Sequence, residues 1–223
     1  MNWSALVAGV SLACALVVTG FVVRREISGP TAVLRPRGLG DYRPTAVPNW
    51  DELAAGGHRM GPPNARFVIV EFADFQCPAC RQFTLKTVAS LRKHYPDDVA
   101  VVYRHWPLPY HPFAHAAARA SECAAAQGRF ERMHDRMFIL QDSIGLKPFV
   151  EFASEAGVPD TLQFVSCIEE SDSSAALADA RAAVALGGRG TPTVLVNGNL
   201  LEGVPDSAGL HAVFLSHMKE QRK

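Results

Sequence analysis

The apolar residues of the chain fall into runs whose period changes along the sequence. Residues 66–75 (RFVIVEFADF) and 99–105 (VAVVYRH) are short, β-branched and aromatic, which is typical of buried strands. Residues 78–94 repeat apolar side chains at the spacing of an amphipathic helix, and Pro78 suits its first position. Because parallel strands need such a crossover, the pattern predicts a strand–helix–strand unit.

The next part of the chain, residues 107–188, carries mainly helical patterns. The helices expected in it span residues 113–127, 130–140, 148–156, 160–168 and 174–186. The sequence GGRGTP, at residues 187–192, then breaks the helical pattern with glycine and proline. We therefore expect an all-helical insertion that ends just before residue 189.

The last part of the chain returns to a strand pattern. The strands expected here span residues 193–197 and 200–204. Asn197-Gly198 is a strong signal for a tight hairpin turn between them. A closing helix over residues 206–219 has Asp206 or Ser207 as its cap.

These elements follow the order βαβ, helical block, ββα. Without the block they make a small four-stranded sheet with helices on both faces, which is the thioredoxin arrangement. The predicted fold class is therefore α/β, thioredoxin-like, with an all-helical insertion between the halves. The expected boundaries are 61–106 for the first half, 107–188 for the insertion and 189–223 for the second half.

The N-terminal segment has a different character. Residues 5–23 are 19 residues without a charge, long enough to cross a bilayer as a helix. A cleaved signal peptide is the alternative, but no Lys or Arg precedes the run and no good cleavage site follows it. We expect residues 1–23 to be a membrane anchor or signal segment, and residues 24–60 to be a proline- and glycine-rich linker with one short helix.

Composition excludes some classes of function. Lys plus Arg equal Asp plus Glu at 22 each, so no charge imbalance points to nucleic acid. The hydrophobic fraction of 48% is enough for a sizeable core. Five cysteines are too few for a disulfide-dense scaffold, so the fold must depend mainly on that core.

Two of the cysteines, Cys77 and Cys80, stand where the first strand gives way to a helix. A cysteine at a helix start faces unpaired N–H groups and the positive end of the helix dipole, and both favour the thiolate. We expect Cys77 to be the exposed nucleophile and Cys80, one turn inside, the more buried resolving thiol. Such a pair exchanges with a substrate disulfide through a mixed disulfide.

Metal binding and a purely structural bridge are the alternatives for this pair. Zinc sites usually need a second pair of ligands, but Cys123 and Cys167 each stand alone. His111 and His115 have helical ligand spacing, but Pro112 places a helix start between them. A CxxC motif that follows a strand and opens a helix favours redox chemistry, so neither a metal nor another cofactor is expected.

Two further positions are candidates for the site. Glu71 lies six residues before Cys77, so its side chain can point to the core beneath the pair and take the Cys80 proton. The alternative for Glu71 is that it lies at the end of the strand with its side chain facing solvent. Pro192 stands just before a strand, where a cis bond would be a structural device, although the sequence does not show whether it is cis.

Three stretches together resemble the DsbA-like thiol–disulfide oxidoreductases, which are thioredoxin-fold proteins with an inserted helical domain. They are VEFADFQCPACRQF, VVYRHWPLPYHPFAHAAARASECAAAQGRFERMHD and GGRGTPTVLVNG, and the resemblance covers about residues 58–220. It implies that Cys77 is the nucleophile, that Cys80 resolves, and that Glu71 is the acid beneath the pair. It assigns substrate contact to Thr191 and Pro192, and we expect Pro78 and Ala79 between the cysteines to contact substrate as well.

One residue departs from the family pattern. The best-known oxidants of the family have His between the cysteines, where this chain has Ala79. Because that His helps to stabilise the thiolate, its absence favours a milder potential. The resemblance also implies a structural disulfide between Cys123 and Cys167, with two separate buried thiols as the alternative. Cys14 is the odd cysteine and is expected to be an inert membrane residue.

Two cysteine pairs indicate an oxidising compartment. Arg24 and Arg25 would hold their end of the anchor in the cytoplasm, but long domains translocate largely regardless of nearby charge. We therefore expect a single-pass protein of the cytoplasmic membrane, with its catalytic domain outside. Its expected partners are cysteine-containing exported proteins and a membrane redox partner. The alternatives are a reductase or isomerase with the same pair, and a non-catalytic binding module.

Overall fold

The computed structural model describes residues 42–221. The expected anchor over residues 1–23, Cys14 and the first part of the expected linker lie outside the described residues. Within residues 42–221, no helix is both long enough and apolar enough to cross a membrane.

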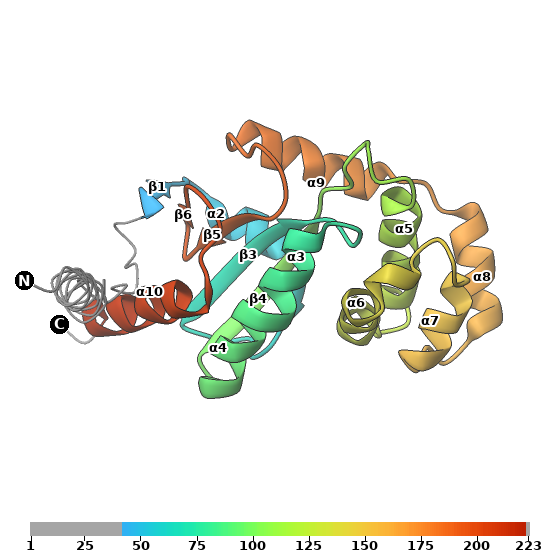
Figure 1. The fold of residues 1–223 in the computed structure, drawn as a ribbon, viewed down its shortest axis with the longest axis horizontal. Helices are drawn as coiled ribbons and strands as arrows, with labels where there is room; N and C mark the ends of the chain where they lie inside the picture. The colour runs from blue at the N-terminus through green and yellow to red at the C-terminus, as the bar shows by residue number, and fades with distance from the viewer. Residues whose placement is uncertain (1–41, 222–223) are drawn as a thin grey trace, which may run out of the picture. The chain divides into compact units, whose positions relative to one another are not determined.

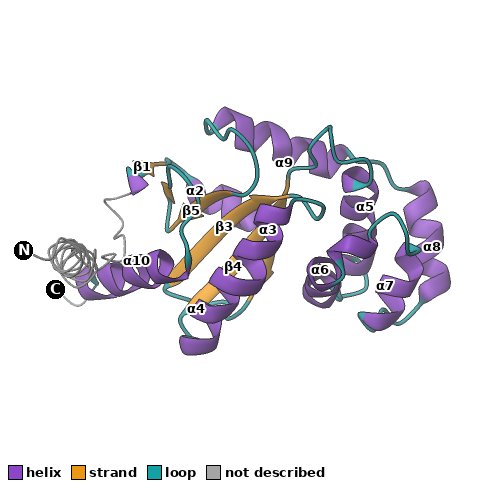
Figure 2. Ribbon diagram, viewed as in Figure 1, coloured by secondary structure: helices purple, strands orange, loops and turns teal. Residues whose placement is uncertain are grey.

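The described residues form one six-stranded sheet (Figures 1 and 2). From edge to edge its strands are β1 (Thr45–Ala46), β6 (Asn199–Leu200), β5 (Thr193–Val196), β3 (Phe67–Ala73), β4 (Val99–His105) and β2 (His58–Met60). The central strands β3 and β4 are parallel, and every other pair is antiparallel. The strand–helix–strand unit and the thioredoxin-like α/β sheet are thus confirmed.

Two predictions about strands were wrong. The expected linker contributes both edge strands, because β1 pairs with β6 and β2 pairs with β4. These strands have two and three residues, too short to show an alternating pattern. The strand expected at residues 200–204 already ends at Leu200. The hairpin turn before it is present, with positive φ at Asn197 (43°) and Gly198 (79°).

The helices cover both faces of the sheet and form a separate block beside it (Figure 1). They are α2 (Trp50–Ala55), α3 (Pro78–Gln82), α4 (Ala89–His94), α5 (Ala114–Ala125), α6 (Phe130–Ile139), α7 (Phe149–Glu155), α8 (Thr161–Glu170), α9 (Ser174–Ala185) and α10 (Ser207–Glu220). A π-helix, η2 (Phe83–Val88), joins α3 to α4, so the helix expected over residues 78–94 is continuous but not regular. Asp206 caps α10 through its side chain, which accepts from Gly209 N.

Alternate residues of β3 point into two apolar layers. Phe67 and Ile69 belong to the larger core, which runs under α3, η2 and α10 into the helical block. Val68 and Val70 belong to the smaller core on the other face, which Ala183 of α9 helps to cover. Therefore α9, which was expected within the insertion, packs on the sheet, while α5–α8 form the block beside it.

Candidate active site

The cysteine pair stands at the start of α3, directly after the end of β3. Cys77 is extended (φ −77°, ψ 119°) and occupies the position before the helix, Pro78 follows in the first turn, and Cys80 lies within that turn. Both thiols are free and buried, with 6% of Cys77 and 0% of Cys80 exposed. Cys77 is therefore more covered than the exposed nucleophile that the sequence predicts, because other segments pack over it.

The surroundings of Cys77 favour its thiolate. A hydrogen bond from the Cys80 thiol is the largest cause that lowers the pKa of Cys77 to about 5, against the opposing effect of burial. Hydrogen bonds from the backbone N–H groups of Ala79 and Cys80 act in the same direction, as does the contact with Thr191. These two N–H groups belong to the first turn of α3, where no helical carbonyl can accept from them. At neutral pH, the Cys77 thiol is therefore ionised.

The loop before β5 lies against the pair. The Thr191–Pro192 peptide bond is cis, and Cys77 Sγ lies 3.4 Å from the Thr191 carbonyl oxygen. A cavity of about 620 Å³ borders Pro192 and continues along Gly187–Gly190. A second hollow of about 210 Å³ is lined by Ala79, Phe83 and Val204. Two of the residues expected to contact substrate, Pro192 and Ala79, therefore border open space.

Glu71 is buried beneath the thiols, not exposed at the strand end. It lies on the same face of β3 as Ile69 and Ala73 of the larger core, is 1% exposed, and its Oε1 has no hydrogen-bond partner. Burial, and then the charge of Cys77, raise the pKa of Glu71 to about 8. Burial and the neighbouring groups, Glu71 among them, also raise the pKa of Cys80 well above its usual value. Glu71 and Cys80 therefore both keep their protons at neutral pH while Cys77 does not.

Two positioning residues were missed in the sequence. Asp74, at the end of the strand, accepts from Gln76 N (2.7 Å), Leu108 N (2.7 Å) and His111 Nδ1 (2.8 Å). Gln141 of the short 3₁₀-helix η3 (Gln141–Ser143) donates to the carbonyls of Phe75 (2.8 Å) and Cys77 (3.0 Å).

These contacts fix the loop that carries Cys77 from both the strand end and the helical block. His111, which was considered only as a metal ligand, takes part in this support. The acid directly before the CxxC loop was a possible signal for Asp74. Nothing local in the sequence marks Gln141.

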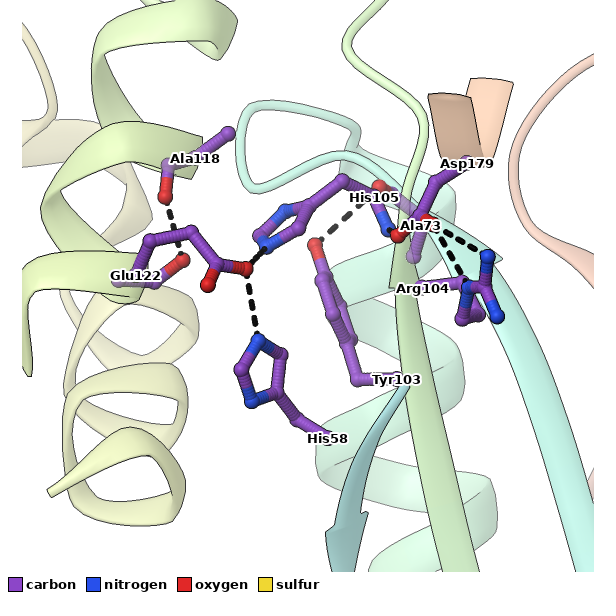
Figure 3. A network of polar contacts seen from close by, with 9 residues as sticks. His58, Ala73, Tyr103, Arg104, His105, Ala118, Glu122 and Asp179 are labelled. Atoms are coloured by element: carbon purple, nitrogen blue, oxygen red, sulfur yellow. Dashed lines mark hydrogen bonds and ion pairs between the residues drawn. The ribbon is translucent and has the colours of Figure 1, made fainter. Parts of the chain in front are cut away.

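A second polar cluster joins the sheet edge to the helical block (Figure 3). Glu122 Oε1 lies 2.7 Å from His58 Nε2 and 2.8 Å from His105 Nε2. Burial opposes ionisation of Glu122, but hydrogen bonds from both imidazoles hold its pKa at about 2. Among the described residues this is the one group of three that could hold a metal ion, with ligand atoms within 4.8 Å of one another. Because the atoms already lie at hydrogen-bond distance, we interpret the cluster as a tie between β2, β4 and α5.

Cys123 of α5 and Cys167 of α8 form a disulfide, with an S–S distance of 1.98 Å and a Cα–Cα distance of 5.8 Å. The bond joins the first and last helices of the helical block. The pairing implied by the resemblance is therefore present in the structure, well separated along the chain from the free thiols.

An ionised cysteine at a helix start, a buried thiol inside the same turn and a proline loop across from them define a thiol–disulfide oxidoreductase site of the DsbA type. The chain belongs to the thioredoxin family, whose model, described as "Thioredoxin", matches residues 54–214.

Solved structures agree with this assignment. A thioredoxin-like oxidoreductase from Silicibacter pomeroyi is 29% identical, has a TM-score of 0.62, and matches 78% of this chain and 98% of its own. Pseudomonas aeruginosa DsbA2 is 28% identical, with a TM-score of 0.50 over 73% of this chain and 92% of its own. Oxidised BdbD from Bacillus subtilis shares the fold at 19% identity, with a TM-score of 0.63 over 80% of this chain and 99% of its own.

The curated relatives carry a different name. The Na(+)/H(+) antiporter NhaA 1 of Mycolicibacterium gilvum is 39% identical over 157 residues, which are 69% of this chain and 25% of the antiporter. The NhaA antiporter of Herminiimonas arsenicoxydans is 38% identical over 160 residues, or 70% of this chain and 25% of its own. The chain thus spans about a quarter of the length of these relatives, and we do not assign their transport activity to it.

Proposed function

We propose that the protein is an extracytoplasmic dithiol–disulfide oxidoreductase that exchanges disulfides with exported proteins through Cys77 and Cys80. The observation that carries the proposal is the opposite protonation of two neighbouring thiols. The pKa of Cys77 is lowered to about 5, whereas that of Cys80 is raised well above its usual value. One thiol is thereby ready to attack or to leave as thiolate, while the other waits as a protonated resolving group.

The proposed oxidation starts from the Cys77–Cys80 disulfide. A substrate thiolate attacks Cys77 Sγ, the disulfide breaks, and Cys80 leaves with the bonding electrons and takes the proton of Glu71. A second substrate thiolate attacks the substrate sulfur of the mixed disulfide, and Cys77 leaves as thiolate. Two electrons thus pass from the substrate dithiol to the cysteine pair. In the reverse direction Glu71 accepts the proton of Cys80.

We propose that the loop of Thr191 and Pro192 binds the substrate backbone. It lies at hydrogen-bond distance from Cys77, and the hollows beside Pro192 and Ala79 leave room for an extended peptide. Pro78 and Ala79 would form the facing side. No further cofactor is needed in this scheme, because the cysteine pair itself carries the electrons.

Location and partners follow from the same chemistry. A free redox pair together with a second, bonded pair suits an oxidising compartment. With residues 1–23 as an anchor, the domain would work at the outer face of the cytoplasmic membrane. A membrane redox partner would then reoxidise Cys77 and Cys80 after each turnover.

Cysteine replacement tests the proposal. Cys77→Ser is expected to abolish both the oxidation of a reduced peptide and the reduction of insulin. Cys14→Ser makes the same chemical change at the odd cysteine and is expected to keep both activities. Full activity of Cys77→Ser would show that the pair is not the reactive centre and would leave the non-catalytic binding module.

A reductase or isomerase is the second candidate, and Ala79 favours it, because a milder potential is expected without His at that position. Equilibration of the pair with glutathione measures the potential. A value near that of DsbA, about −120 mV, supports oxidation, whereas one near that of thioredoxin, about −270 mV, supports reduction.

A further inference from the structure

A cavity of about 150 Å³ lies beside Glu71. It is enclosed by β3, by the η2–α4 helix and by α6 of the helical block. The residues that the argument uses from its lining are Glu71, Thr84, Ala89, Arg92, His134 and Asp135. Ala89 is exposed and the Asp135 side chain is half-exposed, so the cavity connects the buried acid to the outside of the protein.

The cavity collects polar atoms that lack partners. Among the described residues, five buried side-chain nitrogen or oxygen atoms have no hydrogen-bond partner, and three of them belong to this one cavity. They are Glu71 Oε1, Thr84 Oγ1 and His134 Nε2. Buried polar atoms of native proteins are almost always paired, often with ordered water. Since a water molecule occupies roughly 30 Å³, the cavity has room for a short chain of them.

His134 is held in a fixed orientation. Its Nδ1 lies 2.9 Å from Asp135 Oδ1, and since a carboxylate only accepts, Nδ1 carries the proton and Nε2 is left as an acceptor. The rings of Phe75, Tyr103 and Phe138 meet the imidazole at their edges. An imidazole so placed can take a proton at Nε2 and release one at Nδ1.

We propose that ordered water in this cavity and His134 form a proton path between Glu71 and solvent at Asp135. This inference rests on the proposed function, because it supplies or removes the proton that Cys80 exchanges with Glu71. When Cys80 attacks the mixed disulfide, its proton passes to the Glu71 carboxyl as that carboxyl releases its own proton through water to His134 Nε2, while Nδ1 gives a proton to Asp135 and bulk water. No electron moves along this path.

Other titratable groups face Glu71 or line the cavity, but they do not block the proposed path. Cys77 and Cys80 face Glu71 from α3, and Tyr103 faces it from β4, where its OH donates to the Ala73 carbonyl at 3.2 Å. Arg92 of α4 lines the cavity but is paired with Glu131 at 2.7 Å. His134 is thus the titratable side chain best placed to link Glu71 with Asp135, and it acts through Glu71 as a positioning residue.

The reaction of the reduced protein with oxidised glutathione has two steps that can be measured separately, formation of the mixed disulfide and closure of the Cys77–Cys80 disulfide. Mixed-disulfide formation depends on the glutathione concentration and uses only Cys77, whereas closure of Cys77–Cys80 is unimolecular and needs loss of the Cys80 proton. His134→Gln is expected to slow closure roughly tenfold at pH 7, with an unchanged first step and a larger solvent deuterium isotope effect. Ala89→Phe, which fills the exposed rim of the cavity, is expected to do the same without touching a buried residue.

Matched controls make the same changes elsewhere. His94→Gln on the exposed side of α4, and Ala178→Phe on the exposed side of α9, are expected to leave both steps unchanged. Closure rates of His134→Gln and Ala89→Phe within twofold of wild type, or an equal loss in both steps, would overturn the proton path. If His134→Gln does not fold, Ala89→Phe decides the matter alone. Failure of wild type to form the mixed disulfide at Cys77 would instead overturn the proposed function.

Discussion

Replacement of Glu71 by Gln should change how the stability of the reduced protein depends on pH. The carboxyl is 1% exposed, and its pKa is raised from 4.5 to about 8, chiefly by burial. Between these values the folded protein keeps the proton that the unfolded chain has lost. Glu71 by itself therefore favours folding at low pH, and this contribution is lost as the pH rises from 4.5 to 8.

Cys77 makes the opposite contribution over nearly the same range. Its pKa falls from 9.0 to about 5, so from pH 5 to 9 the folded protein has lost a proton that the unfolded chain still holds. Each group changes the free energy of unfolding by about 1.4 kcal/mol per pH unit, with opposite signs. The two contributions nearly cancel in wild type. Glu71→Gln leaves only Cys77, so its stability should rise by about 4 kcal/mol from pH 5 to pH 8.

Urea unfolding under reducing conditions at pH 5, 6, 7 and 8 measures this difference. Cys77→Ser should show the reverse slope, because only Glu71 then titrates, although over a shorter range since the thiolate no longer raises the pKa of Glu71. The contribution of Glu122 is lost between pH 4.5 and about 2 and lies below this window. Parallel profiles of wild type and Glu71→Gln would show that Glu71 is not a buried, protonated acid, and the assigned proton exchange with Cys80 would be refuted.

Three further measurements test the site and its support. The alkylation rate of reduced protein should rise with a midpoint near pH 5, and Cys77→Ser should remove this phase; a midpoint near 9 would contradict the ionised nucleophile. The double replacement Cys123→Ser and Cys167→Ser removes the disulfide between cysteines 44 residues apart, and it should lower the free energy of unfolding in urea by about 4 kcal/mol. An unchanged free energy of unfolding would show that this disulfide does not stabilise the helical block. Asp74→Asn cannot accept from all three of its present donors and should cost about 2 to 4 kcal/mol by the same assay; a loss below about 0.5 kcal/mol would refute its support of the loop.

The parts of the fold that the sequence predicts well are those with local, repeated signals. The strand expected at residues 99–105 matches β4 at both ends, and the strand expected at residues 66–75 contains β3. Both are long, buried and rich in β-branched residues, so their pattern alone indicates their state. The edge strands β1 and β2 lack such a pattern, and their conformation depends on pairing with β6 and β4.

The residues of the site also divide into those that a local sequence signal marks and those that it does not. Cys77, Cys80 and Pro192 could be placed because a motif and its neighbouring strand mark them. Gln141 reaches the carbonyl of Cys77 across a separation of 64 residues, and His134 shares a cavity with Glu71 from a different helix. Such contacts arise from the packing of the helical block on the sheet, which local periodicity does not describe. The helical face that α9 turns to the sheet was missed for the same reason.

The direction of electron flow depends on how the site stabilises one negative charge. Lowering the pKa of Cys77 from 9.0 to about 5 favours the reduced form at pH 7 by about 3 kcal/mol, which raises the potential by roughly 60 mV. Ala79 helps to lower the pKa of Cys77 through its backbone N–H, which any residue but proline could supply. The absence of His at this position is therefore only one of the factors that set the potential. A second charge on Glu71 would oppose the thiolate, but Glu71 stays protonated up to a pH of about 8. In the proposed scheme, the acid that exchanges a proton with Cys80 therefore remains neutral while Cys77 is charged, so the two groups do not oppose each other.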